Sequence, residues 1–144
     1  MRTLTDRTRQ VLLYEAGGLI AISPLFAAVA GITTGDSMAL LAVLSALALG
    51  WTGAFNSAFD HLETRWTGRS ADRRPALLRV LQALLLEAGS TAATTPVIAV
   101  WTGVSWQTAL AEDIGLTLAY TVYAFFYGIA YDRMFPIRVE IRHG

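Results

Sequence analysis

The sequence predicts an all-α integral membrane protein with four transmembrane helices, on three observations. The chain of 144 residues is 54% hydrophobic, with a mean hydropathy of +0.47, and is more apolar than a soluble domain of this length requires. Its apolar residues fall in four runs, each near the ~20 residues that a helix needs to cross a bilayer. Scarce residues recur at a fixed offset. We expect a single membrane domain, 1–144, with helices at 11–32, 38–59, 77–101 and 109–131.

Each of the four apolar runs has sequence features that support a transmembrane helix. The first is apolar except for Glu15 and contains Pro24, which should kink it because proline removes a backbone hydrogen bond. The second carries small residues at every fourth position and ends in an aromatic stretch. The third resembles the first, with Glu87 and Pro96 at the corresponding places. The fourth again ends in aromatic residues.

Composition excludes several classes of function. The formal net charge is zero, so no basic face is available for nucleic acid. The chain has no cysteine, which removes disulfides and thiolate chemistry. The two histidines, His61 and His143, are too far apart to suggest a metal motif. We expect neither a metal nor a cofactor.

The arginines predict the orientation in the membrane. They precede the first helix, lie between the second and third, or follow the fourth. The loop at 32–37 carries Asp36, the loop near 102–113 carries Glu112 and Asp113, and neither carries an arginine. By the positive-inside rule, we expect both termini to be cytoplasmic. The arginines are Arg2, Arg7, Arg9, Arg65, Arg69, Arg73, Arg74, Arg79, Arg133, Arg138 and Arg142.

An internal repeat relates the two halves at an offset of 72 residues. Because matches among scarce residues are hard to obtain by accident, we predict two helix pairs of common origin, at about 7–60 and 79–132. Each unit holds an even number of helices, so the repeats are parallel. The matches are Arg7 with Arg79, Gln10 with Gln82, Glu15 with Glu87, Ala16-Gly17 with Ala88-Gly89, Pro24 with Pro96 and Asp60 with Asp132.

A cleavable signal peptide is an alternative interpretation of the first 31 residues, which have a basic start, an apolar stretch and the small residues Ala28-Val29-Ala30. A carboxylate inside the apolar run, at Glu15, is unusual for a signal peptide. The segment also recurs later in the chain. We therefore expect it to remain as the first helix.

Glu15 and Glu87 are the candidate proton and substrate sites. An ionised carboxylate inside a membrane helix costs several kcal/mol, so each should be protonated, paired or facing a wet cavity. Desolvation disfavours the charged form, which allows a carboxylate to exchange a proton for a cation near neutral pH. A purely structural role, with bonds to arginine or backbone near the interface, is the alternative.

Asp60 and Asp132 close the second and fourth helices beside Arg65 and Arg133. Because a negative charge opposes the dipole at a helix C-terminus, an ion pair with arginines of the basic loops is one reading. Entry of protons or substrate from the cytoplasm is the other. Arg7 and Arg79 belong to the same cytoplasmic group.

Aromatic and small residues lie at helical spacing along the second and fourth helices. The aromatic residues are either packing and interfacial belt residues or the lining of a cation–π path. The small residues allow close helix approach, within the monomer or between protomers. The aromatic set is Trp51, Phe55, Phe59, Tyr120, Tyr123, Tyr127 and Tyr131, and the small set, the small-residue seam, is Ala46, Gly50, Ala54 and Ala58.

These motifs resemble the proteobacterial antimicrobial compound efflux family, a duplicated bacterial transmembrane-pair fold that exports chlorhexidine and other cationic biocides. The resemblance covers about 7–132. The family pattern Arg-x-x-His-x-x-x-Phe-Glu is similar to Arg7, Gln10, Tyr14 and Glu15, and to Arg79, Gln82, Leu86 and Glu87. The pattern Trp-Asn-x-x-Phe-Asn-x-x-Phe-Asp is similar to Trp51, Thr52, Phe55, Asn56, Phe59 and Asp60, and Tyr-x-x-x-Tyr-Asn-x-x-Tyr-Asp to Tyr123, Tyr127, Gly128, Tyr131 and Asp132.

The chain departs from the family pattern at its histidines. Both are glutamine here, Gln10 and Gln82, so a titratable partner near each glutamate becomes a neutral hydrogen-bonding group. Two asparagines are replaced by Thr52 and Gly128. The resemblance implies that Glu15 carries proton coupling, while the changes concern the substrate range.

Three functions follow as hypotheses. The first is a homodimeric, proton-driven exporter of hydrophobic cationic biocides or short-chain diamines, with Glu15 as exchange site and Glu87 as second acidic site. The second is a non-transporting scaffold or assembly subunit that binds a partner through the small-residue seam. The third, an intramembrane enzyme, has the least support because the helices hold no Ser/His, Cys/His or zinc constellation.

Overall fold

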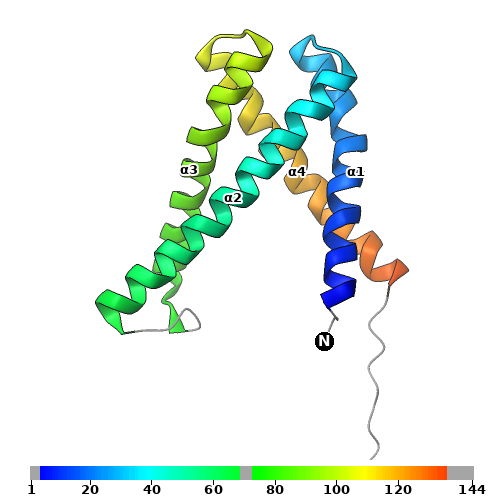
Figure 1. The fold of residues 1–144 in the computed structure, drawn as a ribbon. Coiled ribbons are helices and arrows are strands. Elements are labelled where there is room, and N and C mark those ends of the chain that lie inside the picture. Colours follow the sequence, from blue (N-terminus) through cyan, green and yellow to red (C-terminus); the bar gives the residue numbers. More distant parts are fainter. Residues whose placement is uncertain (1–3, 69–72, 136–144) are drawn as a thin grey trace, which may run out of the picture. The chain divides into compact units, whose positions relative to one another are not determined.

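The computed structural model describes residues 4–68 and 73–135, and these form four long helices (Figure 1). They are α1 (Leu4–Ala30), α2 (Thr34–Thr67), α3 (Ala76–Thr102) and α4 (Trp106–Met134). All four are long and apolar enough to cross a membrane. The predicted class, a four-helix transmembrane protein, is thereby confirmed. Arg2, Arg69, Arg138, Arg142 and His143 lie outside the described residues.

The helix boundaries reproduce the internal repeat. Helices α1 and α3 both have 27 residues and begin 72 positions apart. Helices α2 and α4 begin at Thr34 and Trp106, again 72 positions apart. Gly31 and Gly103, also one offset apart, follow α1 and α3 with φ values of 68° and 72°. This left-handed conformation suits glycine and ends a helix at the same place in both halves.

Hydroxyl side chains then start the second helix of each pair. The Thr33 Oγ1 accepts the Asp36 N–H at 3.0 Å and donates to the Asp36 carboxylate at 2.7 Å, which satisfies an otherwise open donor at the helix start. Ser105, one offset later, accepts the Thr108 N–H at 3.3 Å. The two helices of each pair are therefore joined by a short turn with a glycine at its start and a hydroxyl side chain at its end.

Three helices run well beyond the segments expected from hydropathy alone. Helix α1 begins at Leu4, where a start at residue 11 was expected, and it ends at Ala30. Helix α2 continues to Thr67 through the polar stretch after Phe59, and Gly68, with φ of 65°, follows it. Helix α4 starts at Trp106, so Glu112 and Asp113 lie inside the helix, and the connection before it is only 103–105. Hydropathy marks the part of a helix that suits lipid, whereas capping residues mark where the helix begins and ends.

Most apolar side chains face outward. In each helix no more than 28% of the most apolar 18 residues are buried within the chain. Large side chains such as Val100 and Phe125 are 86% and 65% exposed. An outward apolar surface of this extent is costly in water but suits hydrocarbon.

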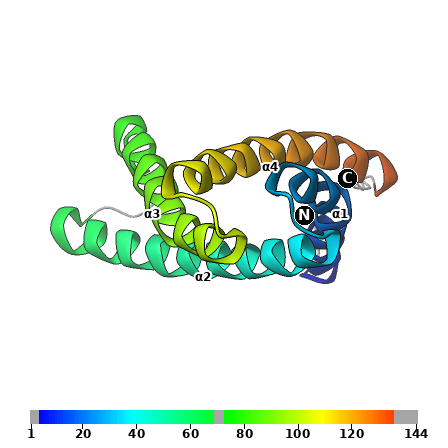
Figure 2. The ribbon, with the colours of Figure 1, turned by 90° about the horizontal axis from the view of Figure 1, so that it is seen from above.

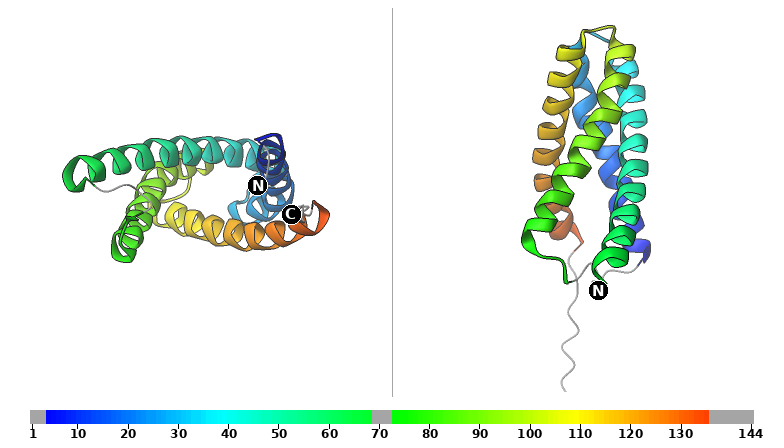
Figure 3. Two further views of the ribbon diagram at one scale, coloured as in Figure 1. Left: turned by 90° about the horizontal axis from the view of Figure 1, so that it is seen from below. Right: turned by 90° about the vertical axis from the view of Figure 1, so that its left-hand side faces the viewer.

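The chain divides into two compact units, and each of them combines helices from both repeats. The first unit combines Met1–Met38 with Gly115–Gly144, so that the second half of α4 runs beside α1 (Figure 2). The second unit is Ala39–Ile114, in which α3 runs beside the second half of α2 (Figure 3, right). Each unit thus brings a glutamate-bearing helix against an aromatic-bearing helix.

Candidate functional site

Three tyrosine hydroxyls of α4 fasten it to α1 in the first unit. Tyr123, Tyr127 and Tyr131 donate to the backbone carbonyls of Tyr14, Gln10 and Asp6, at 2.9, 2.7 and 3.2 Å. The donors are four residues apart along α4 and the acceptors are four residues apart along α1, in the opposite chain direction. Each turn of α1 therefore accepts one tyrosine hydroxyl. The predicted tyrosine face of α4 is thus the face that meets α1.

The same rings form a continuous aromatic column along α4. Neighbouring ring centroids from Tyr120 to Phe135 are 4.8 to 6.3 Å apart, within the range of favourable aromatic contact. The Tyr14 ring joins from α1, with centroids 5.1 Å from Tyr123 and 5.3 Å from Tyr127. Gly17 makes room, because a Cβ there would overlap the Tyr123 hydroxyl.

Glu15 lies next to this column. It is the twelfth residue of α1, about 17 Å along the helix from its start at 1.5 Å per residue. Its side chain is half-buried. Within residues 4–68 and 73–135, no hydrogen bond or ion pair engages its carboxylate. Its charge acts on the phenols of Tyr14 and Tyr123.

The column ends under an arginine. The Arg9 guanidinium lies 3.9 Å from the Phe135 ring centroid and 5.9 Å from that of Tyr131. It also pairs with the Asp6 carboxylate at 2.5 Å and donates to the Tyr131 hydroxyl at 3.3 Å. A cation therefore occupies the face of the terminal rings.

The second unit repeats this arrangement at the offset positions. The Trp51 Nε1–H donates to the Leu86 carbonyl at 2.9 Å, just as Tyr123 donates to the carbonyl before Glu15. Gly89 leaves room for the indole, since a Cβ there would overlap the Trp51 ring. The rings of Trp51, Phe55 and Phe59 follow at centroid distances of 5.6 and 5.8 Å.

Glu87 occupies a different environment from Glu15. It is the twelfth residue of α3, as Glu15 is of α1. Its side chain is exposed on the surface of the chain, whereas that of Glu15 is half-buried. It takes part in at least one polar or ring contact. The two glutamates are equivalent in sequence and unequal in burial.

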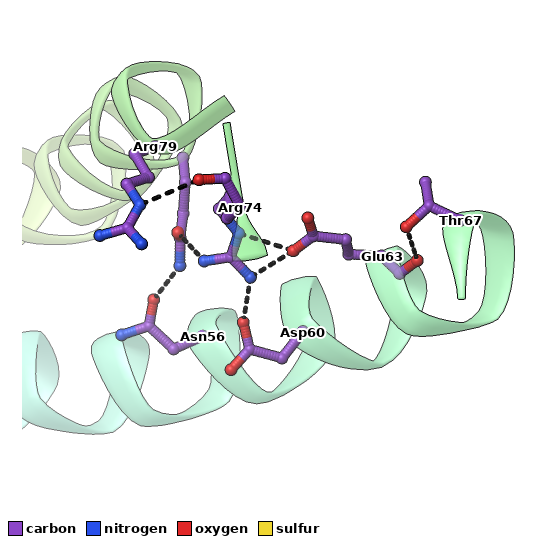
Figure 4. Close-up of polar contacts among 7 residues, drawn as sticks. Asn56, Asp60, Glu63, Thr67, Arg74 and Arg79 are labelled. Atoms are coloured by element: carbon purple, nitrogen blue, oxygen red, sulfur yellow. Dashed lines mark hydrogen bonds and ion pairs between the residues drawn. The ribbon is translucent and has the colours of Figure 1, made fainter. Parts of the chain in front are cut away.

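Arg74, just before α3, is the centre of a polar cluster in the second unit (Figure 4). Its guanidinium contacts the Glu63 carboxylate at 2.5 Å and the Asp60 carboxylate at 2.5 Å, and donates to the side-chain oxygen of Gln82. It also lies 5.0 Å from the Phe59 ring centroid. These hydrogen bonds, first that to Glu63, raise the pKa of Arg74, so its charge is secure.

The cluster is mostly closed to solvent. The side chains of Arg74 and Glu63 are 6% and 3% exposed, whereas that of Asp60 is 49% exposed. Gln82 connects to Asn56 through a hydrogen bond of 2.8 Å, and the Arg79 guanidinium donates to the Arg74 carbonyl at 3.2 Å. Two residues predicted from the efflux pattern, Asn56 and Gln82, are thus brought together.

Asp60 was expected near Arg65, with an ion pair to an arginine of the basic loops as one of two readings, and the structure shows such a pair with Arg74 and not with Arg65. Among the described residues, Arg74 is the cation paired with Asp60. Arg74 lies beside Asp60 and Glu63 of α2 (Figure 4), while Arg65 is exposed on α2. Glu63 was missed because it has no acidic counterpart in the other repeat, where Phe135 stands.

A buried carboxylate near the start of α4 was also missed. Asp113 is 6% exposed, and one of its oxygens accepts hydrogen bonds from Thr94 and Thr95 of α3, both at 2.7 Å. The charge pattern counted Asp113 with the loop near 102–113, although the predicted helix 109–131 includes it, and no partner was predicted for it. Inside α4 the two threonine hydroxyls supply the hydrogen bonds that a buried carboxylate requires.

Other predicted residues lie at the helix surface. Arg7 and Arg79 are exposed near the starts of α1 and α3, and Asp132 is exposed near the end of α4. The small-residue seam, at Ala46, Gly50, Ala54 and Ala58, is exposed along α2. A Cβ added at Gly50 meets nothing within 4 Å.

These features define a class of protein: a multi-pass membrane protein made of two related helical hairpins, with a carboxylate beside an aromatic column. The model of the chlorhexidine efflux transporter family matches the chain twice, at residues 2–65 and 74–137. Both ends of the match are displaced by 72 residues, which confirms the internal repeat and its offset. The chain belongs to the chlorhexidine efflux transporter family, a family of transporters and not of enzymes.

A curated relative agrees with this assignment. A short-chain diamines transporter of Acinetobacter baumannii is 33% identical over 101 residues, which cover 70% of this chain and 65% of the relative. The match therefore spans slightly less than two thirds of that protein. No solved structure matches the chain.

Proposed function

We propose that the protein exports small organic cations across the bacterial inner membrane in exchange for protons, with Glu15 as the exchange site. Cation and proton compete for one carboxylate, so binding of either weakens the other by the same factor. A single charge moved through 100 mV is worth about 2.3 kcal/mol, so the proton-motive force supplies useful driving energy at low stoichiometry. The asymmetric distribution of arginine supports cytoplasmic termini.

This proposal depends most on one observation, the half-burial of the Glu15 carboxylate without a hydrogen bond or ion pair among the described residues. A half-buried carboxylate in a helix of this apolar character is expected to find a partner. Within the described residues it has neither a hydrogen bond nor an ion pair. A carboxylate that no arginine or backbone group satisfies is free to take a proton in one state and a cation in another.

The aromatic column supports the choice of substrate. Rings attract cations at their faces and offer apolar contact to the remainder of a lipophilic molecule. The column already holds the Arg9 guanidinium over its end rings. We therefore propose hydrophobic cationic biocides as cargo, of the chlorhexidine, acriflavine or proflavine and quaternary ammonium types. Short-chain diamines are included because the Acinetobacter baumannii relative is a transporter of these compounds.

A homodimer is proposed on the exposure of two features. The small-residue seam of α2 faces away from the rest of its own chain, and such seams permit close helix contact. Glu87 is exposed at mid-helix, where contact with lipid would be costly. A second copy would cover both.

In native gels and chemical cross-linking, Gly50→Leu should convert a dimer to a monomer, because a large side chain blocks helix approach. A native chain that runs as a monomer throughout would contradict the dimer.

The test of exchange is binding of proflavine to purified protein as a function of pH, for the native chain and Glu15→Gln. Deprotonation of the carboxylate creates the cation site, so native affinity should rise with pH and saturate. Glu15→Gln should lose both the affinity and its pH dependence while keeping its helical circular dichroism. Thr5→Ala, at an exposed position in the first turn of α1, serves as the control.

If the native chain and Glu15→Gln bind proflavine equally, exchange at Glu15 is contradicted. The exposed seam would then favour the alternative of a non-transporting scaffold that binds a partner helix. A scaffold predicts that Glu15→Gln keeps full function in cells, whereas an exporter predicts that this variant loses resistance.

A further inference from the structure

The cluster around Arg74 has the composition of a cation receptor. Two carboxylates, an amide oxygen and an aromatic face converge on one guanidinium. Carboxylates and rings are the groups with which proteins bind charged N–H donors. The cation here belongs to the chain itself, and it is held by Asp60 and Glu63 of α2 and Gln82 of α3.

One acceptor in this cluster has no partner. Glu63 Oε2 takes both contacts from Arg74, while Glu63 Oε1 is buried and receives no hydrogen bond from any described residue. A buried carboxylate oxygen without a donor is costly. Two carboxylates also share the single Arg74 charge in direct contact. Among the described residues, the cluster therefore lacks a donor for Glu63 Oε1.

The fold does not require a carboxylate at this position. In the other repeat the residue equivalent to Glu63 is Phe135, and the equivalent of Phe59 is Tyr131. There Arg9 lies over both rings and pairs with Asp6 from its own helix. Both units thus place a guanidinium over the terminal ring of an aromatic column, and in the second unit this guanidinium contacts two carboxylates of the ring-bearing helix.

We propose that Glu63, Asp60 and Phe59 form a second cation site on the last part of α2, for which Arg74 is the resident cation. The incoming group contacts Asp60 first and then exchanges with Arg74 for the Glu63 carboxylate, where it also bonds to Oε1. Asp60, half exposed, is the open side through which it arrives. This inference rests on the proposed function, because it gives the exported cation a docking place separate from Glu15.

The chemistry of the acceptors selects the cargo. Carboxylate oxygens bind N–H donors, so the site takes a primary ammonium or guanidinium head, as at the end of a diamine or a biguanide. A quaternary ammonium has no N–H group and cannot satisfy Glu63 Oε1. The site therefore discriminates between two cation classes that the aromatic column alone would not separate.

The experiment measures methylguanidinium binding by calorimetry and by thermal stabilisation of the full-length protein in detergent. Arg74→Gln removes the resident cation and should bind methylguanidinium at least about ten-fold more tightly than the native chain, since each charge-assisted hydrogen bond changes affinity by this order. Arg73→Gln, an exposed neighbour, should match the native chain. The double variant Glu63→Gln/Arg74→Gln should lose the gain, and tetramethylammonium should produce none.

The proposal is overturned if folded Arg74→Gln binds methylguanidinium no better than the native chain, or if the double variant keeps the gain. Should Arg74→Gln not fold, Glu63→Gln in the otherwise native chain decides with propane-1,3-diamine: about ten-fold weaker binding supports the site, and unchanged binding refutes it. Repeating the methylguanidinium measurement in Glu15→Gln/Arg74→Gln separates the two proposals. Retained binding there keeps this site even if exchange at Glu15 fails, and lost binding refutes a separate site.

Discussion

Gly89→Ala tests the close approach of α2 and α3 in the second unit. A Cβ at Gly89 would overlap two ring carbons of Trp51, and the indole is rigid and held by its bond to the Leu86 carbonyl. Forcing an extra carbon into a packed contact costs about 1–3 kcal/mol. Loss of the indole hydrogen bond adds about 1 kcal/mol. Alanine returns up to about 1 kcal/mol as a better helix former than glycine. The expected net loss is therefore about 1–3 kcal/mol.

Gly53→Ala is the matched control, because it lies on α2 where an added Cβ meets nothing within 4 Å. It should be neutral or slightly stabilising, by up to about 1 kcal/mol. Unfolding in mixed micelles by titration with sodium dodecyl sulfate, followed by far-ultraviolet circular dichroism, measures both. Equal stability of Gly89→Ala and Gly53→Ala would refute the packing of Trp51 on Gly89.

Further predictions concern hydrogen bonds that cross between helices, and the same titration measures them. Tyr123→Phe removes one hydroxyl bond to α1 and should lower the unfolding free energy by about 1 kcal/mol; no loss would mean that ring packing alone holds this contact. Asp113→Ala leaves the hydroxyls of Thr94 and Thr95 without their shared acceptor and should cost about 1–3 kcal/mol. Asp113→Asn, which keeps an oxygen acceptor, should cost less, and an equal loss in the two variants would contradict this role of the carboxylate.

Hydropathy and repetition were enough to predict the class of fold. A lipid-spanning helix needs a long apolar run, and four such runs are present, so helix number followed directly. The repeat was visible because its marks are rare residues such as Glu15 and Pro24, whose recurrence at 72 is meaningful in a leucine- and alanine-rich chain. The ends of α2 and α4 were less accessible, since polar turns continue a helix without raising its hydropathy.

The sequence identified important residues of the first unit but not the contacts that they make. It grouped Tyr123, Tyr127 and Tyr131 on one face, but their role as donors to backbone carbonyls depends on the approach of α1. That approach is set by Gly17, whose meaning becomes clear only beside Tyr123. Interhelical contacts between distant residues leave no local pattern.

Arg74 and Glu63 show the same limit in the second unit. Arg74 has an arginine counterpart in the other repeat, Arg2, whereas Glu63 has Phe135, and both residues lie beside a polar connection, where charged residues are usually solvated. Their burial results from the contact that they make with each other, which hydropathy does not encode. Repetition finds what two halves share, so it passes over the features that make one half different.

Proton movement in proteoliposomes is the most direct test of exchange at Glu15. Vesicles that contain the native protein, an internal pH dye and an acidic lumen should lose lumenal acidity when proflavine or propane-1,3-diamine is added outside. Empty vesicles measure the passive leak of protons and cations under the same conditions. Glu15→Gln, incorporated to the same density, should give only the leak. Equal proton release from Glu15→Gln and native vesicles would contradict the account.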